Sequence, residues 1–232
     1  MSKEKSDTKK KYYLFEMDIN KVNILCITLF VVFIIISALI YPNNLGKEFY
    51  EVNLVLLVAL YVIWLLLHEL LHSLAYTIYG ASFKKIIYGA YLEKGILYCL
   101  CKQNITRKNI LNSLMFPLFY IGIITYVIAI IFRLPMLLFL SISNIAGSAG
   151  DIIMFTYISK LNKNIEFSEY DNPTQFAIYS DEDVSKIKHY GLNYIESTDT
   201  LKRTNLKKVI ISKGSIIAIL VLVIFTVLSI VL

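Results

Sequence analysis

The sequence lacks the features of a disulfide-stabilised protein and of a nucleic-acid-binding protein. It holds three cysteines in 232 residues, Cys26, Cys99 and Cys101. An odd count without repeated spacing argues against a disulfide framework. Cys99-x-Cys101 is also a spacing for metal-binding thiols, although in an extended segment the two thiols simply point to the same face. The net charge is +6, but no basic stripe interleaved with aromatic residues occurs, so nucleic acid is not an expected partner.

Charged residues are scarce as well, at 17% of the chain, whereas hydrophobic residues make up 57%. A soluble domain carries about 45–50% apolar residues and alternates them with polar ones. Here the apolar residues come in runs long enough to form the helix of about 20 residues that crosses a bilayer. The composition therefore predicts an integral membrane protein, with the lipid bilayer as its surroundings.

Five apolar runs predict an all-α, polytopic membrane fold with about five transmembrane helices. The runs cover residues 22–40, 52–79, 110–132, 134–159 and 209–232. No small-residue cleavage site follows the first run, which indicates a retained span and not a signal peptide. The third run contains Pro117, which a buried helix tolerates when a neighbour satisfies the freed carbonyl. No internal repeat is visible.

The basic residues fall on one side of this arrangement. Lysines and arginines gather before the first run, between the second and third runs, and after the fourth, whereas the two remaining connections carry only Lys47 and Arg133. The positive-inside rule then places the N-terminus in the cytoplasm and the C-terminus outside, in a multi-pass protein of the cell membrane.

Two polar segments between the runs have a structure of their own. Residues 84–102 read as a short membrane-associated hairpin with Gly95 late in its turn. Residues 160–208 form a small cytoplasmic segment. Within it, Ser180-Asp181-Glu182-Asp183 is typical of a helix start and Gly191 of a helix stop.

The second apolar run contains the motif His68-Glu69-Leu70-Leu71-His72. Residues four apart lie one helical turn above each other, so both imidazoles can reach one metal ion. Glu69 projects close by, where it can act as a base without binding the ion. Each ionisable residue within a span costs about 2.5–3.5 kcal/mol, and such residues usually serve function. The alternative is a polar cluster that hydrogen-bonds the neighbouring helices.

A catalytic zinc ion generally has three protein ligands, so one ligand is still to be found. Asp151 is the only other acidic residue well inside an apolar run. Counted along their runs, His68 and Asp151 lie at nearly the same depth, because each helical residue rises by about 1.5 Å. The small residues 147–150 would also allow close helix approach. Asp151 is therefore the predicted third ligand.

Two further polar residues, Asn144 and His189, are candidates for the site. Asn144 lies two helical turns before Asp151 and could bind a substrate carbonyl or a developing oxyanion, or serve only in helix packing. His189 stands between Lys188 and Tyr190 in a polar segment, which indicates a solvated surface residue.

With His68-Glu69-x-x-His72 on one span and Asp151 two spans later, the chain resembles the site-2 protease class of intramembrane zinc metalloproteases. It is still more similar to a small bacterial membrane family described as putative zincin peptidases, on residues 68–75 and 147–152. The resemblance implies a three-helix catalytic core over residues 52–159, a Zn²⁺ cofactor, and a membrane protein or peptide as the substrate. The chain differs from site-2 proteases in having Gly150-Asp151-Ile152 where those proteins have Leu-Asp-Gly.

The sequence thus predicts a tail at residues 1–21, a first helix with its outer loop at 22–51, the core at 52–159, a cytoplasmic segment at 160–208 and a last helix at 209–232. The predicted function is a zinc-dependent intramembrane peptidase with Glu69 as its base. Two alternatives stay open at this point: a membrane zinc peptidase that acts on soluble peptides, and a metal-binding membrane protein without catalysis.

Overall fold

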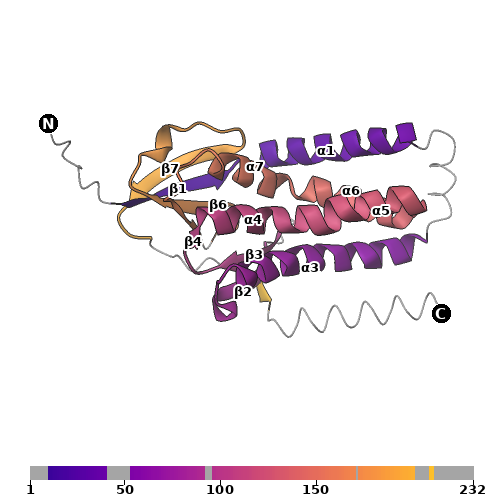
Figure 1. Ribbon diagram of the computed structural model, residues 1–232, viewed down its shortest axis with the longest axis horizontal. Coiled ribbons are helices and arrows are strands. Elements are labelled where there is room, and N and C mark those ends of the chain that lie inside the picture. Colours follow the sequence, from indigo (N-terminus) through magenta and orange to yellow (C-terminus); the bar gives the residue numbers. More distant parts are fainter. Residues whose placement is uncertain (1–9, 41–52, 92–95, 171, 202–208, 212–232) are drawn as a thin grey trace.

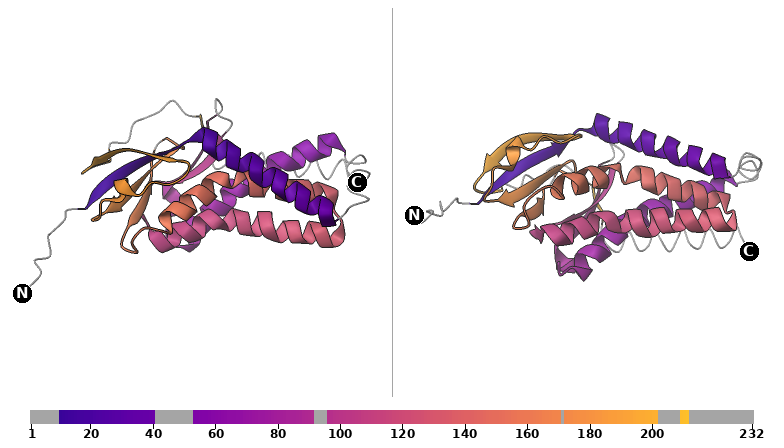
Figure 2. Two further views of the ribbon diagram at one scale, coloured as in Figure 1. Left: turned by 90° about the horizontal axis from the view of Figure 1, so that it is seen from above. Right: turned by 45° about the horizontal axis from the view of Figure 1, so that its top comes forward.

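The structure, a computed structural model, describes residues 10–40, 53–91, 96–170, 172–201 and 209–211. A bundle of helices forms one half of the molecule, and β-strands gather at one end of the bundle (Figure 1). The same division is visible in the two turned views (Figure 2). The helical elements are α1 (Ile19–Ile40), α3 (Leu54–Ile78), α4 (Arg107–Pro117), the π-helical η3 (Leu118–Ile124), α5 (Thr125–Phe132), α6 (Pro135–Gly147) and α7 (Ala149–Ile158).

Three helical stretches within the described residues are long and apolar enough to cross a membrane. They are Ile19–Ile40, Leu54–Ile78 and Arg107–Phe132. The pair α6 and α7 meets the same test as one broken span. These four stretches fall where the first four spans were predicted. The predicted fifth span begins differently, because Val209–Ile211 is a strand, β8; its remainder, 212–232, lies outside the described residues.

The fourth span is not one straight helix. It breaks at Ser148, and its two parts are bent by 43°. Ser148 N–H still donates to Asn144 O, at 3.0 Å, which closes the last turn of α6. The break lies among the small residues 147–150, where side chains do not hold the two parts in line. Asp151 consequently lies in the first turn of a new helix, α7.

The expected all-α class is corrected by two antiparallel sheets. One has five strands in the order β4-β5-β6-β1-β7, and the other has three in the order β3-β2-β8. The strands are β1 (Lys11–Met17), β2 (Ile86–Tyr91), β3 (Ile96–Cys101), β4 (Ile105–Thr106), β5 (Glu166–Glu169), β6 (Gln175–Ser180), β7 (Leu192–Thr198) and β8. The protein thus combines an apolar helical bundle with a mixed polar and apolar sheet.

The N-terminal tail contributes the inner strand of the larger sheet. β1 pairs antiparallel with β6 on one side and with β7 on the other. Its Phe15 is 2% exposed and packs against Tyr157 and Phe176, at centroid distances of 5.1 and 5.7 Å. Residues 11–17 are therefore part of a folded core and not a solvated tail. The sequence did not show this, because their pairing partners lie more than 150 residues later in the chain.

The helix predicted after Ser180 is wrong. Asp183 accepts a hydrogen bond from Ser185 N–H, but it caps only a single 3-10 turn, η4 (Val184–Lys186). Gly191, at φ +78°, leads directly into β7. A short helix without packing is marginal, whereas β7, which follows the turn, is held by its backbone pairing with β1.

The predicted hairpin at residues 84–102 is confirmed by the antiparallel pairing of β2 with β3. A 3-10 turn, η1 (Phe83–Lys85), leads into it, and β8 adds a third strand along β2. β3 is then the outer strand of its sheet and lies beside α3. Cys99 and Cys101 are both buried on this strand and form no disulfide.

Candidate metal centre

The two motif histidines lie on consecutive turns of α3 and face the same point. His68 Nε2 and His72 Nε2 are 3.1 Å apart. His72 is 6% exposed, and His68 is partly buried. This is the geometry expected from a spacing of four residues on a helix.

Asp151 approaches the same point from α7. Its Oδ2 lies 3.3 Å from His68 Nε2 and 3.5 Å from His72 Nε2. One potential ligand atom from each of these three residues lies within 4.8 Å of the others, and this is the one group of this kind among the described residues that could hold a metal ion. The structure thus brings together the residues that the sequence predicted as ligands. Asp151 lies in the first turn of α7, directly after the bend at Ser148.

Two hydrogen bonds through Asn144 fix the ring of His68. Its Nδ1 lies 2.9 Å from Asn144 Oδ1, and Asn144 Nδ2 donates to Pro117 O at 3.2 Å. Since a carbonyl oxygen only accepts, the amide nitrogen of Asn144 must face Pro117 and its oxygen must face the ring. His68 Nδ1 therefore carries the proton. The substrate-binding role predicted for Asn144 stays a prediction, and this contact adds a second role.

The ring of His72 is fixed by a carbonyl that Pro117 frees. Proline has no N–H, so Ser113 O, four residues earlier in α4, has no α-helical partner. His72 Nδ1 lies 3.0 Å from Ser113 O and therefore donates to it. The expectation that a neighbour satisfies this carbonyl is confirmed, and the neighbour is a motif histidine.

These bonds leave three acceptors facing one another. In the tautomers just described, both Nε2 atoms present lone pairs, and Asp151 adds a carboxylate oxygen. In this neutral form the three acceptors, 3.1–3.5 Å apart, repel one another, and either a metal ion between them or a proton on one Nε2 removes the repulsion. Donors about 2.0–2.1 Å from a tetrahedral zinc ion would stand about 3.3–3.4 Å apart. The residues present thus fit a zinc ion in both chemistry and spacing.

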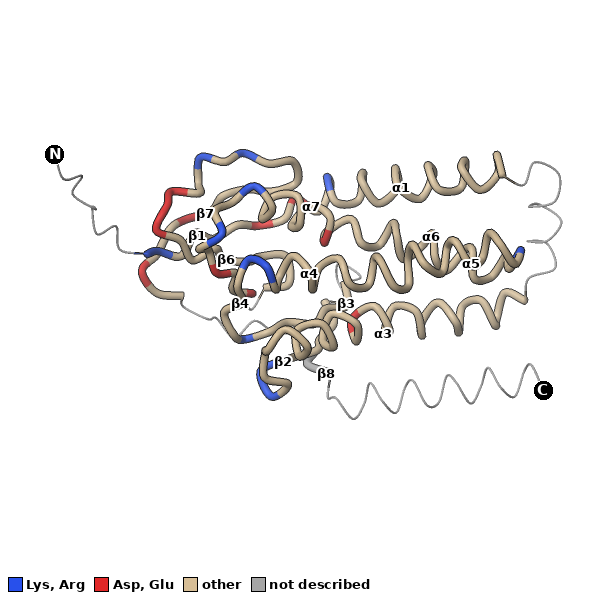
Figure 3. The backbone as a smooth tube through the Cα atoms, in the orientation of Figure 1, with Lys and Arg blue, Asp and Glu red and all other residues tan. Residues whose placement is uncertain are grey.

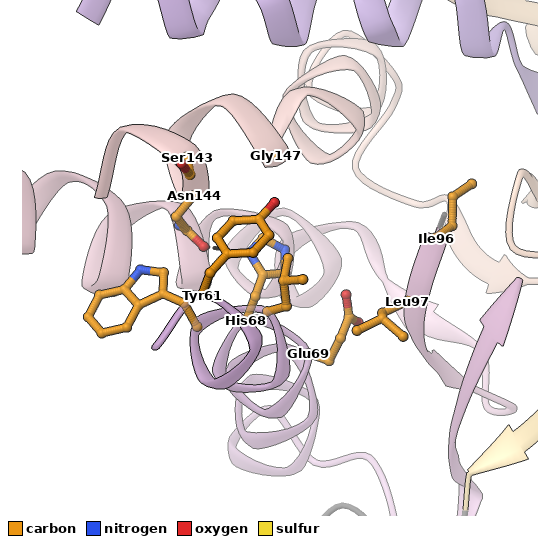
Figure 4. A pocket seen from close by; sticks show the side chains of 10 residues that line it. Tyr61, His68, Glu69, Ile96, Leu97, Ser143, Asn144 and Gly147 are labelled. Atoms are coloured by element: carbon orange, nitrogen blue, oxygen red, sulfur yellow. Dashed lines mark hydrogen bonds between the residues drawn. The ribbon is translucent and has the colours of Figure 1, made fainter. Parts of the chain in front are cut away.

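Glu69 lies at the open side of this triangle. A cavity of about 270 Å³ is lined by Glu69 together with His68 on α3, Leu97 on β3 and Asn144 on α6. Figure 4 shows the His68 ring turned toward Asn144, with the Glu69 carboxyl facing β3 beside it. The backbone N–H of Cys99 lies toward that carboxyl. An acidic side chain therefore stands next to the ligands with space before it.

A second, narrower cavity of about 160 Å³ reaches the triangle from the larger sheet, and it includes two residues that the sequence did not indicate. Tyr76 follows His72 by one helical turn, and its hydroxyl donates to Glu169 Oε1 at 2.8 Å. Glu169 comes from β5 and lines this cavity with His68, His72 and Asp151. Tyr76 continues the stripe of His68 and His72, a signal that could have found it; Glu169 gave none.

His189 lies outside this site, but it is not the solvated residue that was expected. Its Nε2 is 2.8 Å from Thr156 Oγ1, and its ring stacks on Tyr157 at a centroid distance of 5.8 Å. Burial and the nearby Lys160 lower the pKa of His189. His189, in the loop before β7, therefore contacts α7 through Thr156 and Tyr157.

Comparison with known proteins gives one match. Residues 60–165 match the model of a family described as "Putative zincin peptidase". No curated protein and no solved structure matches the chain. The matched segment holds the motif, both strands of the hairpin and Asp151. Over this segment the chain is similar to a family of zincin-like peptidases, which supports a zinc-dependent peptidase.

Proposed function

We propose that the protein is a zinc-dependent peptidase embedded in the membrane, which hydrolyses peptide bonds of membrane-associated substrates. The observation that carries this proposal is the triangle of His68 Nε2, His72 Nε2 and Asp151 Oδ2, with edges of 3.1, 3.3 and 3.5 Å. With neutral imidazoles, whose Nδ1 protons face Asn144 and the Ser113 carbonyl, all three of these atoms are acceptors. A divalent ion fits there, and His68, His72 and Asp151 would hold it.

A bound zinc ion polarises a peptide carbonyl and makes water a stronger nucleophile at neutral pH. The chain supplies the proton transfers. Glu69 takes a proton from the attacking water and then donates it to the leaving amine. Asn144 and the Ser113 carbonyl keep both imidazoles in one tautomer and one orientation, which is the usual work of groups behind metal ligands.

The substrate chain is proposed to lie along β3. A peptide bond in a helix is protected by the hydrogen bonds of that helix, so a membrane-spanning substrate must unwind locally. The outer edge of β3 can accept an unwound segment by strand addition. Ile96 and Leu97 line the cavity that also contains His68 and Glu69, so a chain paired there passes the base.

An apolar cavity of about 490 Å³ supports a substrate from within the bilayer. It lies between α1, α3 and α6 and shares Tyr61, Ser143 and Gly147 with the cavity at Glu69. A Cβ added at Gly147, which lines both cavities, would meet no atom within 4 Å, so there is open space at this residue. Apolar substrate side chains would be received on this side.

The basic residues suggest which end of the bundle faces the cytoplasm. Lysines and arginines gather around the sheets, with little positive charge at the far end of the helices (Figure 3). We propose that the sheets are cytoplasmic and that water reaches the site from that side. The N-terminal strand and residues 175–198 belong to one sheet, so they must lie on the same side.

The test is the metal content of the detergent-purified protein and of three variants. We expect about one zinc per chain in the wild type and in Glu69→Gln, and far less in His72→Ala and Asp151→Ala. Glu69→Gln should lose about 10²–10⁴-fold in peptide hydrolysis, because only the proton transfer is removed. Mass spectrometry of the cleaved substrate would locate the broken bond.

Each alternative has its own result. Zinc in the wild type with equal, near-zero hydrolysis in wild type and Glu69→Gln would support a metal-binding protein without catalysis. Cleavage only outside apolar segments would support a peptidase of soluble peptides. Well-folded wild type without zinc would contradict the proposal and leave a polar cluster between helices.

A further inference from the structure

The outward edge of β3 carries backbone amides that meet three different surroundings. Lys102 N–H donates to Lys85 O at 2.9 Å, so it points toward β2. Backbone groups alternate in direction along a strand. The N–H groups of Leu97, Cys99 and Cys101 therefore point away from β2, toward the metal centre and the larger sheet.

Glu169 occupies one end of this edge. Cys101 N–H donates to Glu169 Oε2, while Glu169 Oε1 accepts from the Tyr76 hydroxyl at 2.8 Å. Tyr76 is 3% exposed and belongs to the helix that carries the histidines. Pairing of Glu169 with Phe176 in β6 fixes its backbone. The carboxyl is thus held by groups from two separate elements, β3 and α3, while β6 fixes the backbone.

The other end of the edge faces open space. Leu97 lines the 270 Å³ cavity with His68 and Glu69. Between the two ends, Cys99 N–H lies toward the Glu69 carboxyl. Three amides therefore follow one another along this strand edge. The Leu97 amide lies at the cavity, the Cys99 amide lies at the proposed base Glu69, and the Cys101 amide donates to Glu169.

We propose that Glu169 is a specificity-determining residue that ends the part of β3 available to a substrate strand. This inference rests on the proposed function. A substrate segment pairs beside Leu97 and reaches Glu69 near Cys99, but it cannot continue to Cys101, because Glu169 already holds that amide. Met17 and Pro173 line the same smaller cavity as Glu169.

The geometry defines the class of substrate. Successive amides on one strand edge are two residues apart, which is about 6.6 Å at about 3.3 Å per residue. A bound chain must turn away from β3 within about two residues of the bond that is cleaved. Peptides that are extended on one side of this bond, and that carry turn-forming Gly, Pro, Asn or Asp just beyond it, fit this path.

Peptidyl hydroxamates of increasing length test the stop without any need for turnover. Two series extend an alanine chain from either side of the hydroxamate, from one to five residues, and dissociation constants are measured on the zinc-loaded full chain in detergent. In wild type and Glu169→Gln, one series should stop gaining affinity after about two residues, since glutamine can still accept from Cys101 N–H. In Glu169→Ala, the same series should gain about tenfold more on further extension.

The matched control is Glu166→Gln on the same strand, whose carboxyl accepts from Asn104 at 2.9 Å, away from β3. It should behave as wild type. The same length dependence in Glu169→Ala and wild type would overturn the inference, as would a gain in Glu166→Gln equal to that in Glu169→Ala. Unchanged zinc content in each variant shows that the site is intact.

Amide exchange separates this inference from the proposed function. If no hydroxamate binds the wild type, the proposed function fails. Hydrogen–deuterium exchange then still measures whether Glu169 holds the Cys101 amide at the edge of β3. The Cys101 amide should exchange slowly in wild type and Glu169→Gln, and about 100-fold faster in Glu169→Ala. Equal exchange in all three proteins would show that Glu169 does not hold this edge.

Discussion

The helical bundle and the five-stranded sheet differ in which side chains face outward. In the bundle, large apolar side chains such as Val31 and Ile131 face outward, at 47% and 66% exposure, while Ser141 and Asn144 are buried. In the sheet, the aromatic residues Phe15, Phe167 and Phe176 are buried. An apolar outer surface suits lipid, whereas an apolar interior suits water.

Inside the bundle, polar side chains are joined in pairs. In the bundle, Thr125 and Ser141 are joined at 2.7 Å, and Ser37 and Tyr126 at 3.0 Å. Every polar group there needs a partner, because lipid offers none. The group of His68 Nε2, His72 Nε2 and Asp151 Oδ2 is the exception, because neutral imidazoles leave three acceptors facing one another there. In the sheet, Glu169 on β5 is hydrogen-bonded to Tyr76 of the helix that carries the motif histidines.

The comparison is tested most strongly by removing one apolar side chain from each half. Phe15→Ala should destabilise the protein by about 3–5 kcal/mol, because it leaves a cavity among packed rings. Its melting temperature in detergent should fall on the order of 10 °C. Ile131→Ala, on the outer face of the bundle, should melt close to wild type, because detergent surrounds that side chain. Equal losses would show that the outer face is packed against protein.

A smaller effect is expected when the support behind His68 is removed. Asn144→Ala deletes the acceptor for His68 Nδ1 and should weaken zinc binding by about 10–100-fold, as for other groups behind metal ligands. Competition with a chelator measures this affinity. Ser143→Ala, on the same helix, should leave the affinity unchanged. Wild-type affinity in Asn144→Ala would mean that the ring of His68 is held by helix packing alone.

The smallest effect concerns the pH dependence of stability at the junction of the two halves. Burial raises the pKa of Glu169 to about 7, while the hydrogen bonds from Cys101 and Tyr76 lower it. The folded protein therefore binds a proton more tightly than the unfolded chain, in which the pKa is about 4.3. This contribution to stability is fully present below about pH 4.3 and is lost as the pH rises through about 7.

Melting temperatures at pH 5 and pH 8 measure this contribution. The wild type should lose more stability between these values than Glu169→Gln, which cannot titrate at this position. Glu166→Gln serves again as the control on the same strand. If wild type and Glu169→Gln fall by the same amount, Glu169 does not titrate in this range.

Much of the bundle could be predicted from the sequence, because each helix is defined locally. Apolar runs of about 20 residues specify helices wherever a bilayer excludes water. The residue count along two such runs predicted Asp151 at the same depth as His68. In the structure, Asp151 Oδ2 lies 3.3 Å from His68 Nε2. Pro117 likewise indicated a freed carbonyl, although not that His72 would use it.

The larger sheet could not be predicted in the same way, because a strand is stabilised by partners that are distant in the sequence. Residues 11–17 resemble a lysine-rich tail until they pair with residues 175–180 and 192–198. Without that pairing, residues 180–191 carry the signals of a helix, and His189 reads as exposed. Strand pairing and aromatic packing overrode these local signals.

The sequence by itself indicated the membrane character of the chain, which follows from its composition. It also indicated the motif of His68, Glu69 and His72, which follows from residue spacing on a single helix. Only the tertiary structure decided which groups orient those side chains, and that Glu169 from a distant strand reaches the edge of β3. The physical reason is that hydrogen bonds between elements depend on how the elements pack, and neither composition nor helical spacing specifies packing across such distances.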